Sequence, residues 1–211
     1  PQNDKGNGFW GNTITVINNF ADKVLNLTLK DVKIDVSDTG NRRVDGKAAL
    51  SVQGVGNVEI ELDGDNELKS GVNRAGLEKN TSDSTGTLTL KDDNNEAGSL
   101  KATGNFNGAG IGGSKDNGTN KIIITGGTVN ATADRNGAGI GGGGKEGNGE
   151  DITITGGTVT ATSEEGGAGI GGGEQGNGED ITITSGTVTA TSKAGGAGIG
   201  GGYQGYGKNI M

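Results

Sequence analysis

The sequence of 211 residues contains no cysteine and no histidine, and its single proline is Pro1. Without cysteine there can be no disulfide scaffold, and a structural zinc site has neither of its usual ligands. Nucleophilic catalysis by a Ser-His-Asp or Cys-His system is excluded for the same reason. No apolar run approaches the ~18 residues that a membrane-spanning helix needs, so no membrane insertion is expected.

Glycine, in contrast, is abundant, with 47 residues in the chain. A collagen triple helix is excluded because glycine does not recur at every third position and proline is nearly absent. High glycine with low hydrophobicity often indicates disorder, but here isoleucine, valine and threonine recur regularly, which favours strands. The net charge of -8 opposes binding to the phosphates of nucleic acids.

One unit recurs through the second half of the chain. Gly-Ala-Gly-Ile-Gly-Gly at residues 108–113 is found again from Gly137, Gly167 and Gly196. Asp-Ile-Thr-Ile-Thr-Gly-Gly-Thr-Val-Thr-Ala-Thr at residues 151–162 recurs from Asp180, with Ser185 in place of Gly156. Each unit holds three short segments that alternate apolar and polar residues, the pattern of strands with one buried face. Glycine-rich corners separate these segments, because glycine adopts turn conformations without steric cost.

Three strands and three corners in each unit predict one coil of a solenoid. We therefore predict an all-β, single-stranded, right-handed parallel β-helix of about six coils of ~29 residues, with ladders of like residues inside. Stacking places Ile152 on Ile181 and Val159 on Val188. An N-terminal cap is expected over residues 1–23 and the β-helix over residues 24–211, with irregular coils over 24–106 and regular glycine-rich coils over 107–211.

The two ends of the chain carry further expectations. Phe9, Trp10 and Phe20 are half of the aromatic residues, and they are expected to cap the solenoid, because its end exposes core and strand edges. The alternative is that Trp10 forms a platform for a ligand. Residues 208–210 repeat the pattern of residues 179–181. A further coil is therefore expected to begin there, and further domains of a longer native chain are expected.

The repeated sequence resembles a known group of proteins. Gly-Ala-Gly-Ile-Gly-Gly-Gly followed by Ile-Thr-Ile-Thr-Gly-Gly-Thr-Val-Thr-Ala-Thr looks like repeats of large surface proteins of Gram-positive, often gut-dwelling, bacteria. It is also similar to clostridial carbohydrate-binding proteins with a right-handed β-helix. The resemblance implies polysaccharide or host or cell-wall glycan as partner, an extracellular or cell-surface location and the ability to hold calcium. It covers residues 86–211 well and residues 24–85 loosely.

Acidic residues follow the first strand of successive early coils. If Leu29, Leu62 and Leu90 are equivalent positions of successive coils, stacking brings the carboxylates that follow them together. Ca²⁺, which prefers oxygen ligands, would relieve the repulsion between these carboxylates. The predicted calcium ligands are Asp63, Asp65, Asp92 and Asp93. A solvated acidic turn is the alternative. A second acidic stack, Glu150-Asp151 above Glu179-Asp180, is interpreted as structural turn residues.

Two further surfaces are candidates for binding. One is a lattice of outward threonines on the second strand of each regular coil, expected at Thr158, Thr160, Thr162, Thr187, Thr189 and Thr191. Threonine also suits exposed strand positions in general, so a merely structural role is the alternative. The other is a glycine face beside the inward isoleucines, expected to point outward at Gly110, Gly139, Gly169 and Gly198. A tight bend is the alternative there.

Two tyrosines complete the candidate binding residues. Tyr203 and Tyr206 replace Glu174 and Asn177 of the preceding coil, at exposed turn positions. Aromatic rings with a polar tip are suited to stacking on sugars, although these rings could equally pack on a further coil. We expect a non-catalytic extracellular binding module for polysaccharide or another repetitive surface. A structural stalk of an adhesin is the alternative, and a polysaccharide lyase or an ice-binding protein is less favoured.

Overall fold

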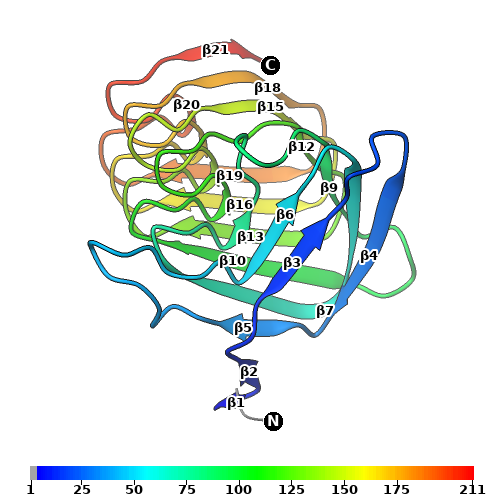
Figure 1. The fold of residues 1–211 in the computed structure, drawn as a ribbon. Coiled ribbons are helices and arrows are strands. Elements are labelled where there is room, and N and C mark those ends of the chain that lie inside the picture. The colour runs from blue at the N-terminus through cyan, green and yellow to red at the C-terminus, as the bar shows by residue number, and fades with distance from the viewer. Residues whose placement is uncertain (1–3) are drawn as a thin grey trace.

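The computed structural model describes residues 4–211, which form strands, turns and loops and no helix. The strands stack into a solenoid with three faces, and its N-terminal end lies at the opposite end from its C-terminus (Figure 1). It makes about six turns, because β20 and β21 begin one more after the sixth. The predicted all-β parallel solenoid is confirmed. Within residues 4–211, no helix has the length and apolar character needed to span a membrane.

The three faces are parallel ladders, here called A, B and C. Face A consists of β5 (Lys33–Asp35), the second part of β7 (Asn57–Val72), β10 (Gly98–Asn105), β13 (Thr128–Ala133), β16 (Thr158–Ser163) and β19 (Thr187–Ser192). Face B consists of β3 (Ile14–Ile17), β6 (Leu50–Gln53), β8 (Leu77–Glu78), β11 (Ile111–Gly112), β14 (Ile140–Gly141), β17 (Ile170–Gly171) and β20 (Ile199–Gly200). Face C consists of β4 (Val24–Lys30), the first part of β7, β9 (Leu88–Lys91), β12 (Ile122–Ile124), β15 (Gly149–Ile154), β18 (Gly178–Ile183) and β21 (Gly207–Ile210).

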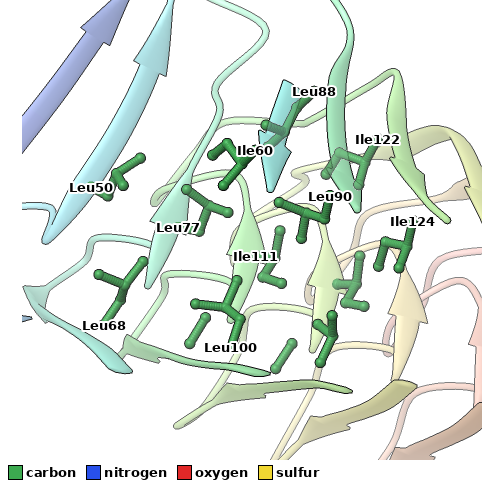
Figure 2. Packing of buried hydrophobic residues seen from close by; sticks show 14 of the residues in the cluster. Leu50, Ile60, Leu68, Leu77, Leu88, Leu90, Leu100, Ile111, Ile122 and Ile124 are labelled. Atoms are coloured by element: carbon green, nitrogen blue, oxygen red, sulfur yellow. The ribbon is translucent and has the colours of Figure 1, made fainter. Parts of the chain in front are cut away.

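Inward side chains form the predicted ladders of like residues. Ile152 pairs with Ile181 and Val159 pairs with Val188, as the repeat spacing predicts. Figure 2 shows how leucines and isoleucines from successive coils fill the interior. Each fully buried leucine or isoleucine contributes about 1.5–3 kcal/mol by leaving water. The narrow interior needs few such residues in each coil, which explains how a chain of low hydrophobicity folds.

Glycines between face B and the next corner hold the coils at strand-pairing distance. Gly112, Gly141 and Gly171 have φ of +133°, +140° and +131°, a region that side chains other than glycine rarely adopt. A Cβ atom at Gly112 would lie 2.0 Å from the carbonyl oxygen of Gly141 in the next coil. This ladder therefore requires glycine for both conformation and space.

The expected outward glycine face is wrong for three of its four members. Gly110, Gly139 and Gly169 are buried, and only Gly198 of the last turn is exposed. A Cβ atom at Gly110 would lie 2.5 Å from the backbone nitrogen of Thr132, which belongs to face A. The glycines allow faces A and B to approach closely at a tight bend, and they offer no surface to a ligand.

A buried ladder of asparagines runs along the corner between faces A and B. Asn107 donates from Nδ2 to Oδ1 of Asn73 at 2.9 Å, and Asn136 donates from Nδ2 to Oδ1 of Asn107 at 2.9 Å. Asn73 in turn donates to Oδ1 of Asp45 at 2.7 Å. Because every amide supplies both a donor and an acceptor, stacked asparagines satisfy each other without water.

The N-terminal segment begins with an antiparallel pair below face A. β1 (Asp4–Gly6) pairs with β2 (Phe9–Trp10), and Trp10 pairs with Ile34 of β5. The ring of Phe9 lies 4.3 Å from Nζ of Lys69. β3 already pairs with β6 in face B, within the segment predicted as a cap, and Phe20 is an exposed loop residue between β3 and β4. Residues 1–3 of the predicted cap lie outside the described residues.

The register assumed for the early acidic residues is wrong. Leu29 pairs with Leu62, as expected, but Leu90 pairs with Ile60 and not with Leu62. The reason is a difference in corner length. β7 runs without interruption through the corner between faces C and A, whereas the third coil leaves face C at Lys91 and enters face A only at Gly98.

Candidate functional site

The predicted threonine lattice lies on the outer side of face A. Thr158 pairs with Thr187, Thr160 with Thr189 and Thr162 with Thr191, so three rows of hydroxyls run along the solenoid. The burial pattern alternates along β16, with Val159 and Ala161 buried and the threonines half-buried or exposed. Stacking on β13 extends the rows by Thr128, Asn130 and Thr132. The lattice therefore covers three coils.

Charged side chains replace the threonines on the earlier coils of face A. The central row continues from Asn130 to Lys101, Glu67 and Lys33. Nζ of Lys101 lies 3.4 Å from Oε1 of Glu67, and Nζ of Lys69 lies 3.2 Å from the same oxygen. Because charged side chains stand here in place of hydroxyls, this half of the face differs in chemistry from the threonine half.

Face C carries a second set of outward threonines that the sequence analysis did not select. Thr153 pairs with Thr182 between the inward isoleucines of β15 and β18. The signal was present in the alternation of Ile-Thr-Ile-Thr, which places isoleucine inside and threonine outside. Ile123 occupies the same outward register in β12, so this row is interrupted in the fourth coil.

The four predicted calcium ligands each have a protein partner of their own. Oδ1 of Asp63 accepts a 2.7 Å hydrogen bond from Nδ2 of Asn94, and Oδ1 of Asp65 accepts one of 2.9 Å from Oγ of Ser99. Further partners are the backbone N–H of Gly98, 3.1 Å from Oδ2 of Asp92, and Nζ of Lys91, 3.2 Å from Oδ2 of Asp93. Across residues 4–211, no three or more acidic side chains are arranged to hold a metal ion.

The calcium hypothesis is tested by thermal unfolding. If Ca²⁺ binds at Asp63, Asp65, Asp92 and Asp93, excess CaCl₂ raises the melting temperature relative to a sample in EGTA, because a ligand that binds only the folded state stabilises it. MgCl₂ at the same concentration serves as the control, since Mg²⁺ demands a stricter geometry. Equal melting temperatures in CaCl₂ and EGTA would contradict the hypothesis.

The interpretation of the second acidic stack as turn residues is wrong, because Glu150-Asp151 lies in β15 and Glu179-Asp180 lies in β18, although both aspartates have a left-handed backbone. Asp151 and Asp180 have φ of +49° and +53°, and Lys121 and Asn209 of the flanking coils have φ of +52° and +51°. Aspartate and asparagine tolerate this left-handed conformation better than other residues with a side chain. Nδ2 of Asn209 donates a 2.8 Å hydrogen bond to Oδ1 of Asp180, so the stack is held by its own members.

The two predicted tyrosines lie on exposed turns after β20. The exposed fractions of Tyr203 and Tyr206 are 48% and 55%, so about half of each residue faces solvent. The hydroxyl of Tyr206 donates a 2.9 Å hydrogen bond to Oε1 of Glu179, and this bond raises the pKa of Tyr206 above its ordinary value. The bond fixes the direction of the Tyr206 ring, because it tethers the outer end of the side chain.

A polar groove adjoins the tyrosines, and the sequence analysis did not identify it. It is a shallow hollow of about 500 Å³, largely open to solvent, and is lined by Glu146, Asn148, Gln175, Asn177 and Gln204. Three stacked turns supply these residues at intervals of one coil, and Nε2 of Gln175 lies 3.3 Å from Oε1 of Gln204. We call this surface, together with Tyr203 and Tyr206, the tyrosine–amide groove.

Hydrogen bonds connect the groove to the tyrosines. The backbone N–H of Gln175 donates to the carbonyl oxygen of Tyr203 at 2.8 Å, and the backbone N–H of Tyr206 donates to Oδ1 of Asn177 at 3.2 Å. Oδ1 of Asn148 likewise accepts from the N–H of Asn177 at 2.9 Å. The turns are therefore held rigidly relative to one another, while several amide groups remain directed to solvent.

Comparison with known proteins supports the fold. A family model described as beta helix repeat matches residues 96–115, 122–144, 152–174 and 181–203. These segments run from β10 in the third coil to β20 at the start of the last turn, where the strands of the three faces recur most regularly. No curated protein and no solved structure gave a match to the chain.

Proposed function

We propose that this chain, a parallel β-helix repeat domain, is a non-catalytic extracellular or cell-surface module that binds polysaccharide in its tyrosine–amide groove. The observation that carries the proposal is the repetition of amide side chains along three successive turns, the last of which also carries two half-exposed tyrosines. A polymer of repeating chemistry is the natural ligand for a surface of repeating chemistry, because several equal contacts form at once.

The residue types of the groove suit sugar hydroxyls. The amides of Asn148, Gln175, Asn177 and Gln204 can each donate and accept hydrogen bonds, and a sugar hydroxyl does the same. Tyrosine adds an apolar ring face with a polar tip, which suits the apolar face of a sugar ring. The groove is rigid before binding, so a ligand loses little affinity to the ordering of the protein.

The charge of the groove favours an uncharged polysaccharide. Glu146 lines it, and Glu179 accepts the hydrogen bond of Tyr206 at its edge. No lysine or arginine is among the lining residues of this described groove. A polyanion such as nucleic acid would meet like charge there and on a chain of net charge -8.

A structural stalk is the second candidate function, and one observation favours it. The inward ladders and the buried asparagine ladder run along the solenoid. Each coil therefore makes its contacts mainly with the two adjacent coils, as in extended repeat proteins. A stalk would hold other domains away from a surface and would bind no glycan. A screen against a glycan array discriminates the two, since a stalk binds none of the polysaccharides.

Two less favoured functions have separate tests. A polysaccharide lyase would release unsaturated products from pectin, with and without Ca²⁺, and an ice-binding protein would show thermal hysteresis through its threonine rows. The non-catalytic proposal expects neither result.

The proposal predicts that the Y206A variant binds polysaccharide more weakly than the wild type. Removing the ring removes its stacking contact and leaves the amides in place, so retention on insoluble neutral polysaccharides is expected to fall by roughly tenfold, equivalent to ~1.4 kcal/mol. Affinity electrophoresis in gels containing the polysaccharide that binds best on the array measures this change.

The F20A variant is the matched control for Y206A. Phe20 is 69% exposed and lies in the loop between β3 and β4, in the first coil, whereas the groove lies on the last coils. Its removal subtracts an exposed aromatic ring without touching the groove. Equal retention of the wild type and Y206A, or equal losses in Y206A and F20A, would overturn the assignment of the groove.

A further inference from the structure

One buried amine lies outside the groove and has no function in the proposal above. Lys79 follows β8 at the corner between faces B and C, and it is fully buried, with an exposed fraction of 0%. Its Nζ donates to the backbone carbonyl of Asn120 at 2.9 Å and lies 3.2 Å from Oδ1 of the same residue. Among the ion pairs formed by residues 4–211, none includes Lys79.

The surroundings of Lys79 favour the uncharged amine. Burial lowers the pKa of Lys79 to about 8, and the positive charge of Lys121 adds to this effect, while Asp83 opposes it. A neutral lysine amine in a desolvated site is a nucleophile, whereas the ammonium form is not. Near pH 8, a large fraction of this buried side chain therefore carries a free electron pair.

Burial also limits what the amine can meet. A side chain without exposed surface is closed to ligands from solvent, so only a group of this chain can react with it. The group in contact is the side-chain carboxamide of Asn120, held by the hydrogen bond to Oδ1. The reacting groups are thus already next to each other, which removes most of the entropic cost of bringing them together.

This pair occurs once in the solenoid. Glu78 pairs with Gly112, so Lys79 stands in the register of Gly113, where the regular coils have glycine. Thr119 pairs with Gly149, so Asn120 stands in the register of Glu150, and Glu150 pairs with Glu179. The repeat therefore requires neither Lys79 nor Asn120. These two residues, which both differ from the repeat, contact each other at one corner.

We propose that Lys79 and Asn120 form an intramolecular isopeptide bond that joins the third coil to the fourth. The electron pair of Nζ attacks Cγ of Asn120, the Nζ–Cγ bond forms and the Cγ–Nδ2 bond breaks. One proton of the attacking amine is transferred to the departing nitrogen, which leaves as ammonia. No atom is oxidised or reduced, and no co-reactant is needed.

Two charged groups act on Lys79 in opposite directions, since Lys121 favours the neutral amine and Asp83 favours the ammonium form. Burial raises the pKa of the Asp83 carboxyl above its ordinary value.

The bond would connect two parts of the solenoid that differ in regularity. Lys79 and Asn120 are 41 residues apart, and the link crosses from the irregular coils to the glycine-rich coils. A covalent link of this span restricts the unfolded chain, as a disulfide does, in a protein without cysteine. The expected result is a higher melting temperature for the linked protein than for unlinked variants.

Intact mass spectrometry tests the proposal on the full chain. The wild type is expected to be lighter than its sequence mass by one ammonia, and trypsin is expected to leave the bond after Lys79 uncut. The K79M and N120A variants are expected at their full sequence mass. N120D is expected either to lose one water, if the acid reacts in place of the amide, or to keep its full mass and melt at a lower temperature.

The K101M variant is the matched control. Lys101 lies on face A with its side chain 60% exposed, and its Nζ pairs with Glu67, so its loss leaves Lys79, Asn120 and their charged neighbours in place, and K101M is expected to remain lighter by one ammonia. Asn-Gly sequences such as residues 117–118 can also lose ammonia, but that loss persists in K79M. A wild type at full sequence mass, or an ammonia loss that persists in folded K79M, overturns the proposal.

Discussion

The G141A variant is expected to lose about 2–6 kcal/mol of folding free energy and, at the upper end, to fail to fold. Gly141 has a φ of +140°, and an added Cβ would lie 1.9 Å from the carbonyl oxygen of Gly171 in the next coil. The methyl group must therefore both strain the backbone and separate two coils that are hydrogen-bonded to each other. Urea unfolding followed by circular dichroism measures the loss.

Gly200 provides the matched control for Gly141. It occupies the same place in the last turn with a φ of +132°, but the nearest atom to its added Cβ is a flexible side-chain carbon at 3.4 Å. G200A therefore carries the backbone strain without the clash and is expected to lose only about 1–3 kcal/mol. If G141A and G200A are equally stable, close coil stacking is not what requires glycine in this ladder.

The N107A variant is expected to lose about 2–4 kcal/mol, the second large effect. Asn107 is 2% exposed and lies between Asn73 and Asn136 in the buried ladder. Its removal leaves the Oδ1 acceptor of the buried Asn73 without a partner away from water, and the half-buried Asn136 loses the acceptor of its Nδ2. Buried polar groups without partners cost more than a hydrogen bond gains. The same urea titration measures the change.

Asn130 is the control for Asn107. It lies on a strand of face A and stacks on its neighbours there, but its side chain is exposed, so water replaces any lost contact. N130A is expected to change stability by no more than about 0.5 kcal/mol. Comparable losses in N107A and N130A would show that burial of the ladder is not the source of its contribution.

The regular coils could be predicted because their pattern is local and repeated. Alternation in a segment such as residues 152–155 assigns isoleucine inside and threonine outside, and the spacing then places Ile152 on Ile181. Equal coil lengths leave no freedom in the register. The same reasoning found the outward threonines of face A.

The early coils could not be predicted to the same depth, because their corners differ in length. Leu90 pairs with Ile60 since the third coil has a long corner between Lys91 and Gly98, where β7 has none. A shift of two residues keeps isoleucine and leucine inside, so the hydrophobic pattern cannot detect it. It does separate Asp92 from the acidic residues with which it was aligned.

The candidate binding surface was predicted in part. Tyr203 and Tyr206 stand out by their contrast with the preceding coil, whereas the sequence analysis did not select the amides of the neighbouring turns. Gln175 and Gln204 have the same spacing as the core ladders, so their periodicity was visible. The spacing does not reveal that the three polar turns line a hollow, because the hollow depends on how far each turn projects from the strands.

The sequence by itself therefore determined the solenoid, its inward ladders and the glycine corners, because each follows from one repeat applied to equal coils. The features that arise where the chain departs from this repeat were decided only by the tertiary structure. It buried the expected glycine surface, gave the acidic residues separate partners, formed the tyrosine–amide groove and placed Lys79 against Asn120. The physical reason is that a period fixes which residues share a ladder, whereas contacts between ladders depend on the length and course of each corner.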